Sequence, residues 1–177
     1  MRAIIFYLSF LLIICISSVS RTHAETPQEY KVKAGYLVNL PLFSDWASPS
    51  QTGCELFAIC IIGETPLYDT FSEVKSRKIK NRSITIRKIN DSNEMNCCQV
   101  LFIAASERYR LQKLLAEAHH RGIMTVSDMR DFTKAGGMVA LTPVQNRIGF
   151  DLNLAVARSA SISFSSHLLK LANDVTK

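Results

Sequence analysis

Two short runs of apolar residues constrain the fold of this chain more than any other feature of its sequence. The run LFAICIIG covers residues 56–63 and stops at a glycine, and the run CQVLFIA covers residues 98–104. A half-exposed strand alternates apolar and polar residues, whereas a strand covered on both faces is apolar throughout. The two runs therefore predict central strands of a sheet that is buried on both faces.

Segments around these runs alternate between helical and strand-like patterns. Apolar residues at helical spacing predict helices over about 29–43, around Leu67, Phe71 and Val74, over 111–118, and along Leu168, Leu171, Ala172 and Val175. Strand patterns cover residues 83–89, 123–128, 137–142 and 147–152, and the last two are joined by a short turn. Ser127 or Asp128 is expected to cap a short helix after residue 128, and Asn153 is expected to cap another.

This order of elements is typical of an α/β domain. It predicts a three-layer sandwich with a mostly parallel central sheet and an antiparallel hairpin near the C-terminus. Right-handed crossovers would place the strand 83–89 on one side of the strand 56–62 and the strand 98–104 on the other.

The first residues have the pattern of a secretory signal peptide. Arg2 precedes an apolar run that is shorter than a membrane span, and Thr22 and Ala24 fit the positions before a cut after Ala24. We expect residues 1–24 to be removed and residues 25–177 to form one domain in the periplasm. Loss of Arg2 and Arg21 would lower the net charge from +6 to +4. Nucleic acid is not an expected partner of such an exported chain.

Export changes how the four remaining cysteines are interpreted. Cys54, Cys60, Cys97 and Cys98 would lie in an oxidising compartment, where an even number of cysteines favours disulfides. Three pairings are possible, and a bridge between the neighbours Cys97 and Cys98 is sterically the least favoured. The spacings lack the paired ligands of a structural zinc site.

A series of motifs runs through the whole mature chain in a fixed order. They are YKVKAGYLVNL with Phe43 and Trp46, CIIGETPL at 60–67, CQVLFIAASE at 98–107, TVSDMRDF at 125–132, AGGMVAL at 135–141, RIGFDLNLAVAR at 147–158 and SSHLLKLANDV at 165–175. In this order the chain resembles the YfiR family, small periplasmic proteins that regulate membrane-bound diguanylate cyclases.

The resemblance implies regulation by binding. A family member represses an inner-membrane diguanylate cyclase by contacting its periplasmic domain, and an outer-membrane-associated protein can release the repression. This chain would then lower cyclic di-GMP and biofilm formation, and it would act as a homodimer. A periplasmic sensor that binds a small molecule is the alternative function.

The resemblance also implies a disulfide between Cys60 and Cys98. Some family members have a second cysteine pair flanking the two glycines, and residues 131–141 of this chain have no cysteine. If the two buried strands begin in register, however, Cys54 approaches Cys97 and Cys98 more readily than Cys60 does. The pairing therefore stays open between these alternatives.

Two groups of residues are candidate binding sites. In a parallel sheet, ligands enter at the carboxyl ends of strands where the strand order reverses, and this predicts a crevice lined by Gly63, Glu64, Ser106, Ser127 and Asp128. The hairpin region could instead present a partner-docking surface with Gly136, Gly137, Arg147 and Asn153. Structural roles compete with docking there, because glycine permits unusual backbone angles, Asn153 can cap a helix and Arg147 could pair with Asp151.

A basic cluster lies between residues 75 and 88. Its members are Lys75, Arg77, Lys78, Lys80, Arg82, Arg87 and Lys88. Such a cluster is typical of a solvated face that protects an edge strand, and docking to an acidic domain is the functional alternative. The sequence has no G-x-S-x-G, no H-E-x-x-H and no phosphate loop. No catalytic residue, metal or cofactor is expected, and the protein is expected not to be an enzyme.

Overall fold

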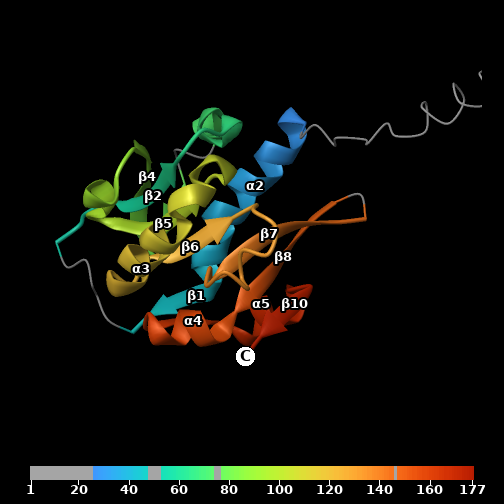
Figure 1. Cartoon of the computed structure of the whole chain (residues 1–177). Coiled ribbons are helices and arrows are strands. Elements are labelled where there is room, and N and C mark those ends of the chain that lie inside the picture. The colour runs from blue at the N-terminus through green and yellow to red at the C-terminus, as the bar shows by residue number, and fades with distance from the viewer. Residues whose placement is uncertain (1–25, 48–52, 74–76, 146) are drawn as a thin grey trace, which may run out of the picture.

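Eight strands form the main sheet of the computed structural model, which describes residues 26–47, 53–73, 77–145 and 147–177 (Figure 1). In chain order these strands are β2 (Phe57–Ile62), β3 (Lys78–Ile79), β4 (Arg82–Ile89), β5 (Cys98–Ile103), β6 (Met124–Ser127), β7 (Val139–Val144), β8 (Arg147–Asn153) and β10 (Asp174–Thr176). Their spatial order is β10-β8-β7-β6-β5-β2-β4-β3.

Short helices connect the strands. The α-helices are α2 (Pro27–Asn39), α3 (Leu111–His120), α4 (Leu154–Ser159) and α5 (Ser166–Leu171). Four 3-10 helices complete the connections: η2 (Leu40–Phe43), η3 (Pro66–Glu73), η4 (Ser92–Met95) and η5 (Ala105–Arg110). A separate two-stranded antiparallel sheet joins β1 (Ser44–Trp46) to β9 (Ile162–Phe164).

The centre of the sheet confirms the prediction from the two apolar runs. Every residue of β2 and β5 is buried, and the two strands pair in parallel. β4 pairs in parallel with the opposite edge of β2, so the chain steps to one side of β2 and then returns to the other. The strand order therefore reverses between β2 and β5, as the right-handed crossovers predict.

Two hydrophobic cores lie on opposite faces of the sheet. On one face, Leu37 and Val38 of α2 pack with residues such as Ile59 and Phe102, together with parts of η3, α4 and α5. On the other face, the α3 residues Leu111, Leu114, Leu115 and Ala118 pack with Ile62, Leu101 and Ile103. Figure 1 shows α2 and α3 on opposite sides of the central strands. The three-layer α/β sandwich with a mostly parallel sheet is confirmed.

The antiparallel hairpin near the C-terminus is also confirmed. β7 and β8 pair from Val139 with Leu152 to Val144 with Arg147, so the strands run further toward the tip than residues 137–142 and 147–152. β6 pairs with β7 only at Val126 and Ser127. The outer half of the hairpin therefore extends beyond the end of β6, and Figure 1 shows it projecting from the body of the protein.

Three sequence predictions about helices are corrected. The predicted helix after residue 128 is absent, because residues 129–136 form bends and turns. The predicted closing helix ends at Leu171, and Val175 lies instead in β10, where it pairs with Leu152. The segment around Leu67 and Phe71 is a 3-10 helix, and Val74 lies outside the described residues. Within the described ranges, no helix is long and apolar enough to cross a membrane.

Candidate functional site

At the carboxyl ends of β2 and β5, where the sequence predicts a crevice, side chains pack closely around Gly63. Gly63 has a φ of +92°, and a Cβ at this position would lie 2.6 Å from Ser106 Oγ and 2.7 Å from Glu107 Cγ. The backbone N–H of Glu64 donates a hydrogen bond to Ser106 Oγ at 2.8 Å. Gly63, Glu64 and Ser106 therefore come together as the sequence predicts, but in a tightly packed turn.

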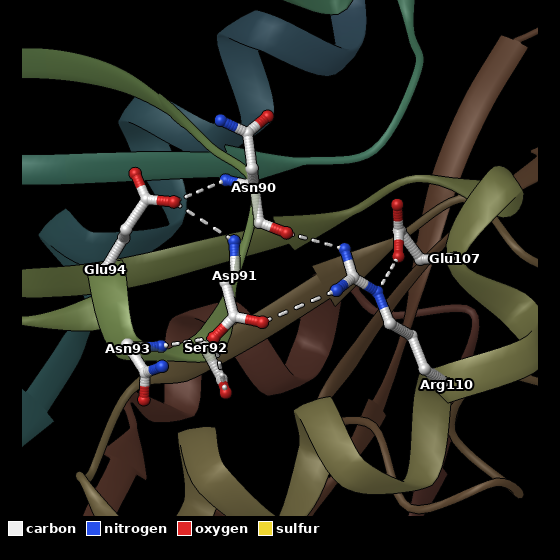
Figure 2. Close-up of polar contacts among 7 residues, drawn as sticks. All are labelled: Asn90, Asp91, Ser92, Asn93, Glu94, Glu107 and Arg110. Atoms are coloured by element: carbon white, nitrogen blue, oxygen red, sulfur yellow. Dashed lines mark hydrogen bonds and ion pairs between the residues drawn. The ribbon is translucent and has the colours of Figure 1, made fainter.

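A polar cluster closes the same end of the sheet next to this turn, and we refer to Asn90, Asp91, Glu94, Glu107 and Arg110 as the switch-point cluster (Figure 2). The Arg110 guanidinium hydrogen-bonds Glu107, donates to the carbonyl of Asn90 at 2.8 Å and lies 3.9 Å from Asp91 Oδ2. Glu107 is only 7% exposed. The hydrogen bond with Glu107 raises the pKa of Arg110.

The remaining carboxylates of the cluster form a capping box at the start of η4. Asp91 Oδ1 accepts from the Asn93 N–H at 3.0 Å, and Glu94 Oε1 accepts from the N–H groups of Asn90 and Asp91 at 3.1 and 3.2 Å. The hydrogen bond from Asn93 is the largest of the effects that lower the pKa of Asp91. Each carboxylate of the switch-point cluster is thus held by its neighbours, and the arrangement fixes the loop after β4 against η5.

Ser127 and Asp128 lie apart from that cluster, at the carboxyl end of β6. The Ser127 hydroxyl is fully buried, donates to the Ile103 carbonyl at 2.6 Å and accepts from the Met129 N–H at 3.1 Å. Asp128 Oδ2 lies 2.8 Å from Lys33 Nζ of α2. The structure therefore divides the five predicted crevice residues between two places.

A pocket of about 580 Å³ lies beside Asp128, between the start of α2, the turns after β6 and the β7–β8 hairpin. Its charged lining residues are Glu29, Lys33, Asp128, Arg130, Asp131, Lys134, Asp151 and Asp174. The Lys33 ammonium lies 3.3 Å from Glu29 and 4.8 Å from the centre of the Tyr30 ring. Burial and the nearby Asp174 raise the pKa of Asp151, in that order of importance.

Lys33 is one of the residues of this pocket that the sequence patterns did not single out. Its side chain is only 1% exposed, although lysine is among the residue types least often buried. The sequence held a signal for it, because Lys33 is three residues after Tyr30 and four before Leu37, on the apolar stripe of the helix. Asp174 could not be placed in the same way, because its strand was predicted as helix.

Three of the predicted docking residues make contacts inside the fold. Gly136 has a φ of +100°, and a Cβ on Gly137 would lie 2.1 Å from the Phe132 ring. Asn153 caps α4 through the Val156 N–H at 3.0 Å and donates to the Thr133 carbonyl at 3.0 Å. Arg147 is exposed near the hairpin tip. The expected ion pair between Arg147 and Asp151 does not form in the described hairpin.

Disulfides join Cys54 to Cys97 and Cys60 to Cys98, with 5.8 Å between the Cα atoms of each pair. The register of β2 and β5 allows both bridges, because Cys98 pairs with Ala58 and the ladder then shifts, so that Val100 pairs with Ile59. Gln99 is the extra residue, and its side-chain oxygen accepts from the Ala58 N–H at 2.6 Å. The structure therefore contains the Cys60–Cys98 bridge that the resemblance implies. It also joins Cys54 to Cys97, one of the two cysteines that the register argument placed near Cys54.

Several side chains of the basic cluster bind acceptors of this same chain. Lys80 pairs with Asp45, Arg82 donates to the carbonyl of Cys54 at 2.7 Å, and Arg87 donates to the carbonyl of Asn96 at 2.7 Å. Lys75 lies outside the described residues. The part of the chain that the structure describes contains no group of three or more side chains able to hold a metal ion.

Two solved structures have folds similar to this chain. One is described as a conserved domain protein from Vibrio cholerae O1 biovar eltor str. N16961, with a TM-score of 0.53, 9% identity, 85% of this chain covered and 60% of that chain covered. The other is the ABC domain from Streptococcus pneumonia in complex with L-Trp, with a TM-score of 0.54, 8% identity and coverages of 83% and 60%. This chain thus spans less than two thirds of either structure. At such low identity, the two likenesses show the fold alone.

Comparison with curated proteins finds no match. The model of the YfiR/HmsC-like family, however, matches residues 30–173. This range includes every strand of the main sheet but β10. The match also spans the motifs that carry the resemblance, except the last two residues of the final motif. This chain belongs to the YfiR/HmsC-like family.

Proposed function

We propose that this protein represses an inner-membrane diguanylate cyclase by binding the cyclase's periplasmic domain. Family membership carries the proposal, since the YfiR-like family is regulatory and non-enzymatic and supports a periplasmic regulator of diguanylate cyclase. Repression would lower cyclic di-GMP and reduce biofilm formation. An outer-membrane-associated protein would release the cyclase by competing for the repressor.

Two features of the chain support export to the periplasm. Its four cysteines outside the signal-like segment are all in disulfides, which persist in oxidising compartments. Residues 1–24, which have the signal-peptide pattern, lie outside the described residues. If export proceeds as we propose, N-terminal sequencing of protein from the periplasm will begin at Glu25. A sequence that starts at Met1 would contradict cleavage after Ala24.

The proposed docking surface is the outer part of the β7–β8 hairpin with Arg147. This part projects beyond β6, so a partner can approach it without displacing the core (Figure 1). Gly136, Gly137 and Asn153 would support the surface from below, since their contacts fix the base of the hairpin and the start of α4. A repressor shifts a two-state enzyme only through its preference for the inactive state. Moving a cyclase from 99% active to 99% inactive requires a preference of about 10,000-fold for the inactive state.

Deletion and complementation in the native host test the function directly. We expect cyclic di-GMP to rise in cells that lack the protein and to return to the parental amount when the wild-type chain is supplied. The purified mature chain should bind the isolated periplasmic domain of the cyclase. Unchanged cyclic di-GMP in the deletion strain would overturn the proposal.

Charge reversal at the hairpin tests the docking surface. Arg147→Glu should weaken binding to the cyclase domain, whereas Arg158→Glu, an exposed arginine on α4, should leave binding unchanged. Equal effects of both variants would point to overall charge instead of the hairpin. We also propose that the active form is a homodimer, which sedimentation equilibrium of the mature chain would show as twice the monomer mass.

A further inference from the structure

The two disulfides differ in their exposure to solvent. Cys60 and Cys98 are both fully buried, and their bridge joins β2 to β5 at the centre of the sheet. Cys97 is exposed and Cys54 is half-buried, and their bridge joins the segments that precede the same two strands. Burial protects a disulfide from attack by thiols, whereas exposure permits it. The Cys54–Cys97 bridge is therefore the accessible one.

Arg82 places an uncompensated positive charge beside Cys54. Its guanidinium donates to the Cys54 carbonyl at 2.7 Å, and no carboxylate among the described residues lies within ion-pair distance of it. The Nε atom of Arg82 is buried and has no hydrogen-bond partner in the part of the chain that the structure describes. A buried N–H group normally has a partner, so Arg82 keeps one donor unused next to the bridge.

Two further arginines approach the other end of the bridge through Asn96, the residue before Cys97. Arg87 donates to the Asn96 carbonyl at 2.7 Å, and Arg121 donates to its side-chain oxygen at 2.8 Å. Arg121 also pairs with Glu117 at 3.6 Å. A neighbouring guanidinium stabilises a cysteine thiolate, which makes that sulfur a better leaving group. Positive charge therefore lies near both ends of the exposed bridge.

Cys97 also has an unusual backbone conformation. Its φ is +61°, in the left-handed region that residues other than glycine seldom adopt. Residues held in such conformations cluster at sites with a function. The turn at Cys97 separates this exposed residue from Cys98, which is the next residue and is fully buried. Two neighbouring cysteines thus have different surroundings, and only one of them is open to a reagent in solution.

We propose that the Cys54–Cys97 bridge is a site of thiol–disulfide exchange and that the Cys60–Cys98 bridge is structural. The thiolate of a small thiol attacks the exposed Cys97 sulfur and forms a mixed disulfide with it, while Cys54 leaves as a thiolate beside Arg82. A second thiolate attacks the thiol's own sulfur in the mixed disulfide and releases Cys97 as a thiolate. Two thiols are thereby oxidised to one disulfide, and the two cysteines are reduced.

The chain stays folded when this bridge opens. The Cys60–Cys98 bridge encloses nearly the same loop, with a separation of 38 positions against 43. It lies within the ladder of β2 and β5, so it holds the central strands together without the exposed bridge. Exchange then alters the segments before the two strands and leaves the core intact. This inference does not depend on the cyclase proposal, because the chemistry of the cysteines reports on it directly.

Stepwise reduction of the purified mature chain tests the proposal, with glutathione at millimolar concentration as the thiol. Free cysteines are alkylated with iodoacetamide under native conditions, and mass spectrometry of peptide fragments distinguishes the neighbours Cys97 and Cys98. We expect Cys54 and Cys97 to become alkylated about tenfold faster, or more, than Cys60 and Cys98. Equal rates for all four cysteines, faster alkylation of the buried pair, or no reduction at all would overturn the proposal.

The mixed disulfide identifies the attacked sulfur. In samples quenched with acid early in the reaction, we expect glutathione to be attached to Cys97. Attachment to Cys54 would overturn the assignment of Cys97 as the attacked residue. A variant with both Cys54→Ala and Cys97→Ala retains only the buried bridge, and its melting transition shows whether it is folded. Rapid reduction of Cys60–Cys98 in this folded variant would show that the buried bridge is not protected, and the proposal would fail.

Substitution of Arg82 tests the role of charge. Arg82→Gln removes the positive charge beside the leaving Cys54 thiolate and should slow reduction of the exposed bridge by a few fold. Arg82→Lys keeps the charge and should recover most of the rate. Arg158→Gln, the matched control at an exposed position of α4, should change nothing. Loss of a merely structural contact would loosen the segment and accelerate reduction, so a faster reaction in Arg82→Gln would overturn the electrostatic role of Arg82.

Discussion

The carboxylates in the half of the sheet around β2, β4 and β5 differ in their surroundings from those in the half around the β7–β8 hairpin. At the carboxyl ends of β2, β4 and β5, the carboxylates of Asp91, Glu94 and Glu107 are held by the chain's own donors (Figure 2). At the end of β6, beside the hairpin, Asp151 and Asp174 are register partners at the edge of a pocket, and burial together with Asp174 raises the pKa of Asp151 although Asn173 and Thr142 hydrogen-bond it. The switch point between β2 and β5, where ligands usually enter such folds, is the closed one.

This difference indicates which half of the sheet leaves space for a binding partner. The closed half is braced by two disulfides and by side chains that fill the turn after Gly63. The open half has a hairpin that projects beyond its neighbouring strand and a pocket of about 580 Å³ beside it. Position in the sheet alone therefore does not determine where the fold is open, because side chains close the turn after Gly63 and leave a pocket beside the hairpin.

Removal of both disulfides should have the largest effect and should destabilise the closed half most. Each bridge separates its cysteines by 43 or 38 positions, and a loop of that length contributes about 4 kcal/mol on the chain-entropy model. Because the bridges are adjacent, the second one closes only a small additional loop and adds about 2 kcal/mol. We expect the variant without cysteines to unfold at much lower urea concentration than either single-bridge variant. Equal stability of all these variants would contradict this account.

Substitution of Gly137 should have the next largest effect, and it concerns the open half. Gly137→Ala would place a Cβ 2.1 Å from the Phe132 ring, and relief of this overlap should cost about 3 kcal/mol. Gly35→Ala is the control, since nothing lies within 4 Å of the new methyl group and α2 should gain up to about 1 kcal/mol. Urea unfolding measures both changes. A folded and equally stable Gly137→Ala that fails to bind the cyclase domain would instead assign the glycine a direct docking role.

A third prediction compares one ion pair from each half. Arg110→Ala leaves the nearly buried Glu107 carboxylate without its partner, and we expect a loss of about 2 kcal/mol, below the range for full burial because the arginine is partly exposed. Lys134→Ala removes an exposed pair with Asp131 and should cost much less than Arg110→Ala, because solvent screens exposed ion pairs. Chemical unfolding of both variants gives the difference. Equal losses would remove the energetic distinction between the halves.

The sequence predicted the sheet well because its signal is local. The apolar runs at residues 56–63 and 98–104 needed no knowledge of the rest of the chain, and they define β2 and β5. The closing segment failed because helical spacing of Leu168, Leu171, Ala172 and Val175 fits a helix equally well. Pairing of Val175 with Leu152 in the sheet outweighed that local pattern, and no short-range signal records such a long-range contact.

The sites were less predictable for a related reason. The reversal of strand order correctly located Gly63, Glu64 and Ser106 at one end of the sheet, but topology does not record whether side chains fill the crevice. Glu107 packs against Gly63, and Arg110 joins Glu107 to Asn90 of the loop after β4. The pocket beside Asp128 depends on β10, whose strand was not predicted. Packing between segments far apart in the chain determines both features.

The smallest effect we predict is a pair of opposite pH dependences, one from each half. The pKa of Asp91 is lowered in the folded state, so its stabilisation is present above the ordinary aspartate value near 3.9 and is lost as the pH falls through the lowered pKa. Asp91→Asn should therefore be less stable than the wild type at pH 7, and the two proteins should converge as the pH falls toward 3.

Asp151 should behave in the opposite way. Its pKa is raised by burial and by Asp174, so its stabilisation is complete below about 3.9 and is lost as the pH rises through the raised pKa. Asp151→Asn should therefore match or exceed the wild type at pH 7 and lose that advantage in acid. Urea unfolding between pH 3 and pH 7 measures both differences. The same direction of change in both variants would show that burial and Asp174 do not disfavour the Asp151 carboxylate, and the electrostatic contrast between the two halves would fail.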